Sequence, residues 1–156
     1  MKALTLITSL LCAASALAYA DAPFVVSVDG KEVTDSRTGL IWKRCAEGMT
    51  AKVSTCNGTA RTFSYDEAAA HAAKQAGASK VAWRLPTSEE LLGIADEKRF
   101  KMAIDTSAFP GTPPEHFWTS TRYIENYYFA VNFYNGFHYD RYYTSPHYVR
   151  LVRAGR

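Results

Sequence analysis

The chain has 156 residues, 47% of them hydrophobic and 13% aromatic, and its 18 basic and 15 acidic residues give a net charge of only +3. This length fits one domain, and the sequence has no low-complexity segment, internal repeat or Gly/Ser linker. So weak a charge provides no electrostatic footprint for nucleic acid, and we expect no nucleic-acid partner.

Residues 1–20 have the three parts of a secretory signal peptide. Lys2 supplies a positive start, Leu4 to Leu17 is almost unbroken apolar sequence, and residues 18–20 form an A-x-A cleavage site. A membrane anchor needs about 20 apolar residues, so this run is too short to be one. We expect cleavage after Ala20 and a single domain over residues 21–156. This domain would have no membrane insertion and would reach the periplasm, the cell surface or the medium.

Export changes the interpretation of the cysteines. Cleavage would remove Cys12 and leave Cys45 and Cys56, and an even pair in an oxidising compartment predicts a disulfide. The alternatives are two free thiols or two metal ligands. No histidine or further cysteine lies near the pair in sequence, and acidic ligands are not clustered elsewhere. We therefore expect neither a metal nor another cofactor.

Apolar, β-branched strings separated by turn residues predict extended structure over residues 24–44. Strands are expected at 24–28, 32–34 and 40–42, and residues 45–62 are expected to form a loop held by the disulfide.

Two capping boxes predict two helices. Ser64 and Glu67 open an alanine-rich helix that is expected to stop at Gly77, a natural C-cap residue. Thr87 and Glu90 open a shorter helix that carries Leu91, Leu92 and Ile94.

Strand-forming sequence dominates the rest of the chain. Strands are expected at 117–121, 127–134, 137–143 and 148–153, with Asn135-Gly136 as a tight hairpin turn. The predicted fold class is therefore α+β, with two helices packed on a mainly antiparallel sheet and a strand-rich C-terminal half.

Six short segments of the sequence match motifs of one known protein family and occur in the same order as in that family. They are residues 33–35, 38–42, 83–91, 117–121, 131–136 and 148–153. With them the chain resembles the Lcl C-terminal domain family, named from a bacterial collagen-like adhesin, from about Asp29 to Arg153. The resemblance implies a C-type-lectin-like fold, related to the formylglycine-generating enzymes, in exported bacterial proteins. For the namesake it implies binding to sulfated polysaccharides or host surfaces. The calcium-binding triplets of C-type lectins are absent from the sequence, which argues against calcium-dependent sugar binding.

An enzyme is not expected. The formylglycine-generating relatives use a cysteine pair near the C-terminal end of the domain, and no cysteine follows Cys56. Ser120, His138 and Asp140 could be assembled into a triad, but their spacing does not resemble a nucleophile elbow.

The C-terminal third has the composition of a binding surface. Eight of the ten tyrosines lie between Tyr123 and Tyr148, among asparagines and histidines, as in antibody paratopes. If Phe129, Val131 and Phe133 face the core, their neighbours should face outward together. The predicted ligand-binding residues are Tyr128, Asn132, Tyr134, His138, Tyr139, Tyr142 and Tyr143.

The competing interpretation is that tyrosines merely suit half-buried strands. Trp42, Trp83 and Trp118 lie in apolar strings and are assigned to packing rather than to sugar stacking.

Two classes of function follow from these observations. The first is an exported recognition module that uses this face to bind a glycan, a surface polymer or a surface protein. The second is a structural or assembly component of the envelope with the same face as a protein–protein interface. The sequence leaves the oligomeric state open, a homo-oligomer included.

Overall fold

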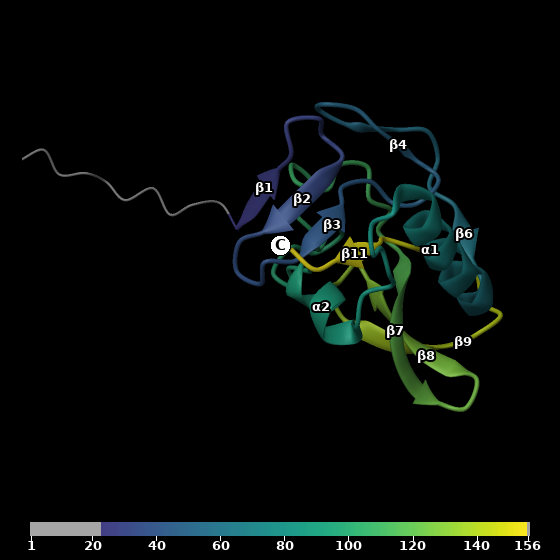
Figure 1. Cartoon of the computed structure of the whole chain (residues 1–156). Coiled ribbons are helices and arrows are strands. Elements are labelled where there is room, and N and C mark those ends of the chain that lie inside the picture. Colours follow the sequence, from purple (N-terminus) through teal and green to yellow (C-terminus); the bar gives the residue numbers. More distant parts are fainter. Residues whose placement is uncertain (1–22, 156) are drawn as a thin grey trace, which may run out of the picture.

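The computed structural model describes residues 23–155, so the predicted signal peptide and its cleavage site lie outside the described residues. Within these residues the chain forms a four-stranded sheet, a five-stranded sheet, a small hairpin and two helices (Figure 1). The mixed α+β class predicted from the sequence is confirmed.

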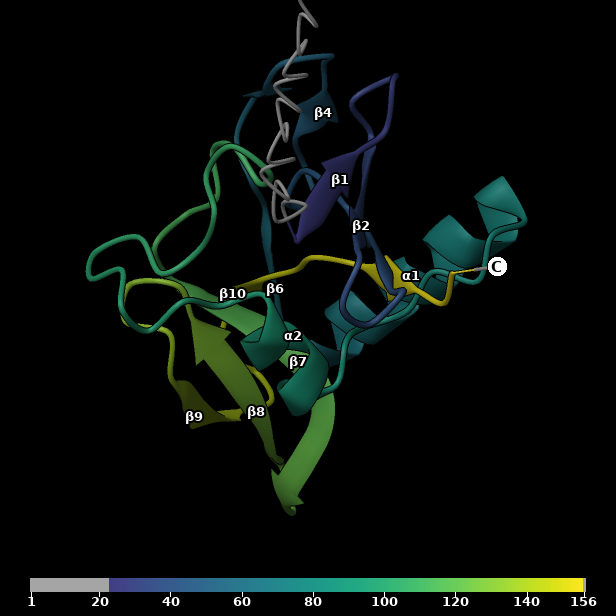
Figure 2. The same cartoon turned by 90° about the vertical axis from the view of Figure 1, so that its left-hand side faces the viewer.

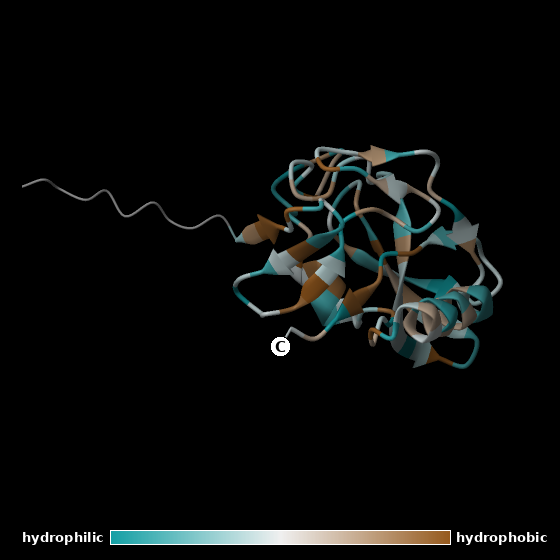
Figure 3. Ribbon diagram, turned by 45° about the horizontal axis from the view of Figure 1, so that its top comes forward, coloured by the Kyte–Doolittle hydropathy of each residue, from teal (hydrophilic) through white to brown (hydrophobic). Residues whose placement is uncertain are grey.

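The four-stranded sheet joins the two ends of the described chain. Its order is β1-β2-β3-β11, with all neighbours antiparallel. The bounds are Phe24–Val26 for β1, Glu32–Asp35 for β2, Ile41–Lys43 for β3 and Val152–Arg153 for β11. Val33, Trp42 and Val152 are cross-strand partners and are fully buried. Hydrophobic residues accordingly concentrate in these strands (Figure 3), and the assignment of Trp42 to packing is confirmed.

The five-stranded sheet has the order β6-β10-β7-β8-β9. The bounds are Thr62–Phe63 for β6, His116–Ile124 for β7, Tyr127–Asn132 for β8, His138–Tyr142 for β9 and His147–Tyr148 for β10. β10 runs antiparallel to β6 but parallel to β7.

The predicted closing strand, residues 148–153, is divided between the two sheets. Tyr148 belongs to β10, whereas Val152 belongs to β11. Between them the Arg150 side chain enters the core, where it is fully buried and donates to the carbonyl of Lys43 at 2.9 Å and to Oγ1 of Thr112 at 2.6 Å. The buried guanidinium thus fixes the chain at the point where it crosses from one sheet to the other.

Both predicted helices form, but the first is longer than expected. Helix α1 spans Tyr65–Ser79 and begins with both hydrogen bonds of the Ser64 capping box. It continues past Gly77, and Lys80, with φ 58°, provides the left-handed C-cap. The predicted stop at Gly77 was wrong because one glycine costs only about 1 kcal/mol in a helix interior, too little to end an alanine-rich helix. Helix α2 spans Ser88–Gly93 and begins with the Thr87 capping box.

The predicted disulfide joins Cys45 to Cys56. It ties β5 (Cys56–Asn57), which forms a hairpin with β4 (Thr50–Ala51), to the loop after β3, so residues 45–62 are not wholly irregular as expected. The buried Arg44 side chain donates to the carbonyl of Val53 at 2.8 Å and to that of Ala108 at 3.1 Å, which ties this hairpin to a distant loop.

The β8–β9 connection is also longer than predicted. Asn132 donates its backbone N–H to the carbonyl of Phe137 at 2.9 Å and accepts from the N–H of Gly136 at 2.8 Å. The turn therefore has four residues, 133–136, and ends at Gly136 with φ 81°. Phe133, expected at the end of the strand, lies in this turn but is fully buried, as predicted.

Candidate functional site

The five-stranded sheet has one face toward α1 and the other toward α2. Side chains directly opposite on neighbouring strands share a face. On the α1 face lie Trp118, Ala130 and Tyr139. On the α2 face lie Phe117, Val131 and His138. Trp118 and Ala130 belong to the apolar cluster that includes residues of α1, and Phe117 and Val131 to the cluster that includes residues of α2.

The predicted binding residues are divided between these faces. The set on the α1 face is Tyr128, Asn132 and Tyr139. The set on the α2 face is His138 and Tyr142. Tyr134 lies in the turn and Tyr143 follows β9. The expectation of one common outward face was wrong because β8 is covered on both sides, as the complete burial of Ala130 and Val131 shows.

Tyr128 is the member of the set most involved in packing. Its ring stacks on that of Tyr65, the first residue of α1, with centroids 3.4 Å apart. Burial raises the pKa of Tyr65 to about 12, and the neighbouring Tyr128 adds to the effect. The carbonyl of Tyr143 accepts from the backbone N–H of Tyr65 at 2.7 Å. These two tyrosines hold the start of α1 against the sheet.

On the α2 face His138 is oriented by two contacts. Its Nδ1 lies 2.8 Å from Oγ of Ser88 in α2, and its ring stacks on Phe129 with centroids 4.6 Å apart. Tyr142 contacts Tyr127 edge to face and remains 42% exposed.

The open part of the α1 face holds a polar cluster that we call the Arg141 cluster, formed by His116, Asn132, Tyr139, Arg141 and His147. Nη2 of Arg141 donates to Nε2 of His116 at 2.6 Å, and the guanidinium lies 5.1 Å from the centre of the Tyr139 ring. Nδ2 of Asn132 lies 3.3 Å from the same His116 nitrogen. The His147 ring lies 5.3 Å from that of His116.

The two histidines of this cluster are held neutral. Burial, together with the nearby Arg141, lowers the pKa of His116 to about 4. Burial, then His116, then Arg141 lower the pKa of His147 to about 4 as well. Because a guanidinium only donates, Nε2 of His116 must be the acceptor and its proton must lie on Nδ1. Nε2 of His147 is buried and has no hydrogen-bond partner within residues 23–155.

Comparison with protein families decides the membership of the chain. The family model of the Lcl C-terminal domain matches residues 31–153. The chain belongs to the Lcl C-terminal domain family. No curated protein and no solved structure matches it.

Sequence reasoning about this Lcl C-terminal domain missed three members of the cluster: His116, Arg141 and His147. Period-two alternation was the available signal, since His116 precedes the buried Trp118 by two residues and Arg141 follows Tyr139 by two. An alternation that starts at Phe129 does not extend to these three residues, and charged residues in strands ordinarily face solvent.

The domain has a second concave region between α1 and the disulfide hairpin, about 550 Å³ in volume. At its floor the buried carboxylate of Glu47 pairs with Nζ of Lys43 at 3.0 Å and with Nε2 of His71 at 2.5 Å. Nζ of Lys43 also donates to Gln75 at 2.8 Å. These bonds join β3, the loop before β4 and α1, so the polar groups are already satisfied by one another.

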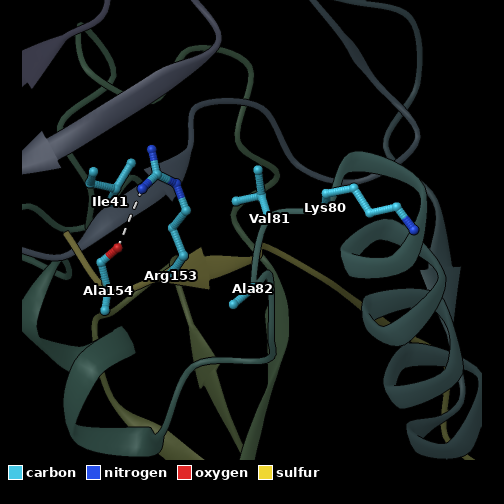
Figure 4. Close-up of a pocket in the computed structure, with 6 residues that line it drawn as sticks. All are labelled: Ile41, Lys80, Val81, Ala82, Arg153 and Ala154. Atoms are coloured by element: carbon cyan, nitrogen blue, oxygen red, sulfur yellow. Dashed lines mark hydrogen bonds between the residues drawn. The ribbon is translucent and has the colours of Figure 1, made fainter. Parts of the chain in front are cut away.

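A third hollow lies beside β11 (Figure 4). Its guanidinium belongs to Arg153, which already donates to Oε2 of Glu32 at 2.8 Å and to the carbonyl of Ala154 at 3.3 Å. Lys80 extends away from Arg153 in this view. The hollow offers a ligand few free polar groups.

Within residues 23–155, no group of three or more histidine, cysteine, aspartate or glutamate side chains is arranged to hold a metal ion. None of the helices in the same part of the chain is long and apolar enough to cross a bilayer.

Proposed function

We propose that this domain is an exported bacterial recognition module, not an enzyme, that binds its ligand through the Arg141 cluster. The observation that carries the proposal is the state of Arg141. Its guanidinium is half-buried on the sheet, yet it pairs with no carboxylate within residues 23–155. Its hydrogen-bond partners are a neutral imidazole and the carbonyl of Asp140.

This arrangement suits a ligand with an acidic group. A guanidinium has five N–H donors in a fork that matches a carboxylate or sulfate, and a ligand anion would replace the weaker imidazole acceptor. Tyr139, 37% exposed, adds a flat apolar surface beside the charge. We therefore expect an acidic glycan, surface polymer or surface protein.

The C-type-lectin-like architecture and the export are parts of the same proposal. Two helices, two antiparallel-rich sheets and a disulfide are compatible with that architecture. A disulfide is also what an oxidising compartment outside the cytoplasm would maintain.

The alternative is a structural component of the envelope whose C-terminal sheet forms a permanent interface. The exposed rings of Tyr123, Tyr139 and Tyr142 would then be buried in a stable oligomer. Sedimentation velocity on the mature protein separates this alternative from a free recognition face.

The test is a binding screen with residues 21–156 on arrays of neutral glycans, acidic glycans and surface proteins. Tyr139→Ala and Arg141→Gln should each weaken binding about 30-fold, roughly 2 kcal/mol, as for residues that anchor an interface. Tyr123→Ala, at an exposed tyrosine on the far side of the β7–β8 hairpin from α1, is the matched control and should bind normally. Equal binding by all three variants would refute the proposal.

A further inference from the structure

Strand β9 forms a free edge of the five-stranded sheet. It is the last strand in the sheet order and pairs only with β8 among the described strands. Figure 2 shows β9 at the outside of the molecule, beyond β8. Four of its five residues are exposed, Arg141 being the exception.

The outward backbone groups of β9 follow from its pairing with β8. Asn132 bonds to Phe137, and the N–H of Tyr143 donates to the carbonyl of Asn126 at 2.9 Å. Hydrogen-bonded and non-hydrogen-bonded pairs alternate along an antiparallel ladder, so residues 137, 139, 141 and 143 face β8. The N–H groups of His138, Asp140 and Tyr142 therefore point away from the sheet.

These three N–H groups have no hydrogen-bond partner within residues 23–155. Two of the carbonyls beside them are engaged only locally, that of Asp140 by the side chain of Arg141 and that of Tyr142 by the N–H of Ser145. The strand thus offers a row of backbone donors to an added strand.

A hollow of about 490 Å³ lies at the start of this edge, on the α2 face. Its apolar walls come from Leu92 in α2, from Ala95 just after α2, and from Phe137 and His138. Phe137 is 52% exposed. The hollow is placed to receive one side chain of a strand that pairs with β9.

We infer that β9 accepts an extended segment of a partner polypeptide as a sixth, antiparallel strand. The inference rests on the proposed recognition function and names the class of its ligand. Backbone hydrogen bonds to His138, Asp140 and Tyr142 supply the affinity, and side chains on the two faces supply the selectivity.

The charges along β9 define the chemistry of that segment. A residue opposite Arg141 lies on the α1 face, where an acid meets the unpaired guanidinium. A residue opposite Asp140 lies on the α2 face, where a base meets an exposed carboxylate. The residue opposite His138 is apolar and enters the hollow. Read from its N-terminus, the antiparallel segment has the order acid, base, any residue, apolar residue.

A second copy of the chain fits this edge poorly. Two-fold pairing centred on Asp140 places that carboxylate opposite its own copy. The register that instead places Asp140 of the copy opposite His138 brings a carboxylate to the hollow, whose charged lining of Asp96, Glu97 and Lys98 is acidic on balance. Like charges opposite one another destabilise a strand pair.

The experiment is selection of displayed random peptides on immobilised mature protein, followed by a scan of backbone N-methylation along the enriched peptide. Enriched sequences should share the acid, base, any, apolar order. Methylation should weaken binding tenfold or more, roughly the loss of one or two hydrogen bonds, at the base and at the apolar residue. At the acid and the intervening residue, whose amides face away from β9, it should be tolerated.

A protein variant tests the same point from the other side. Asp140→Pro removes an outward N–H and leaves the hydrogen bonds to β8 intact, a change that an edge strand tolerates. The peptide should therefore lose at least tenfold more affinity for Asp140→Pro than for Asp140→Ala. The scan needs no protein variant, so it decides the matter even if Asp140→Pro misfolds.

Other outcomes overturn the inference. The inference would be overturned if N-methylation had the same effect at every position of the peptide, or if the selection enriched no peptide. Loss of a dimer in Asp140→Pro would assign the edge to a second copy. If an acidic glycan binds equally to wild type and Asp140→Pro but not to Arg141→Gln, the inference fails and the proposed function stands. If Tyr139→Ala and Arg141→Gln also bind normally, both fail.

Discussion

Acidification should destabilise this domain through the two histidines of the Arg141 cluster. The pKa of His116 and that of His147 are lowered from 6.5 to about 4 in the folded chain. The unfolded chain therefore binds more protons between these values, and stability must fall as the pH falls through that window. Above about pH 6.5 the two neutral histidines contribute fully to the free energy of unfolding. Below about pH 4 their contribution falls no further.

The size of the effect follows from the same values. A fall in pKa from 6.5 to about 4 corresponds to roughly 3 kcal/mol for a fully shielded histidine. Both rings retain part of their exposure, and solvent screening reduces the contribution to roughly 1–2 kcal/mol each. The pKa values of Asp35 and Glu90, lowered from 3.8 and 4.5, place the losses from these carboxyl groups at lower pH.

Urea unfolding at pH 7.0, 6.0, 5.0 and 4.5 measures this loss. The wild type should lose roughly 2–3 kcal/mol over the range, whereas a variant with His116→Gln and His147→Gln should lose much less. NMR titration of the ring C–H resonances reads the two pKa values directly, and Arg141→Gln should raise that of His116. Ring titrations centred near 6.5 in the wild type would show that the cluster is open to water and would refute the electrostatic reasoning.

Two further predictions concern stability. Gly77→Ala should stabilise the domain by about 0.5–1 kcal/mol in thermal or urea unfolding, because outside its own helix no atom lies within 4 Å of the added Cβ. Gly136→Ala, at φ 81° and with Glu97 Cα only 3.0 Å from the new Cβ, should do the reverse. Replacing Cys45 and Cys56 by serine should lower the free energy of unfolding by roughly 2–4 kcal/mol, and unchanged stability in reducing buffer would contradict a structural role for the disulfide.

The features predicted well from the sequence are those set by local chemistry. Each helix begins where its capping box places it, because the Ser64 and Thr87 side chains satisfy amides within the next turn. The disulfide needed only an even cysteine pair. The prediction of one continuous closing strand was wrong because of a tertiary contact. The closing strand is divided because the Arg150 side chain has hydrogen-bond partners more than 30 residues away in the sequence.

The candidate site was harder to predict than the fold. Alternation correctly placed Val131 in the core, but it could not show that α1 also covers the other side of β8. Tyr128 was therefore expected in the open, whereas it lies under Tyr65. A strand read by itself has one inward and one outward side. A strand whose sheet carries a helix on each face has two buried sides. Which positions on either side remain exposed to solvent depends on the packing of the whole sheet.

The contrast among the buried and half-buried arginines explains why Arg141 is the one suited to a ligand. Arg44, Arg141 and Arg150 donate to no carboxylate within the described part of the chain. Arg44 and Arg150 are almost completely buried, and their guanidinium groups are surrounded by backbone carbonyls. No ligand can reach them, and their role is to fix loops. Arg141 keeps part of its surface and donates only to a neutral ring and to one neighbouring carbonyl. It can therefore exchange a weak acceptor for an anionic one at little cost to the fold.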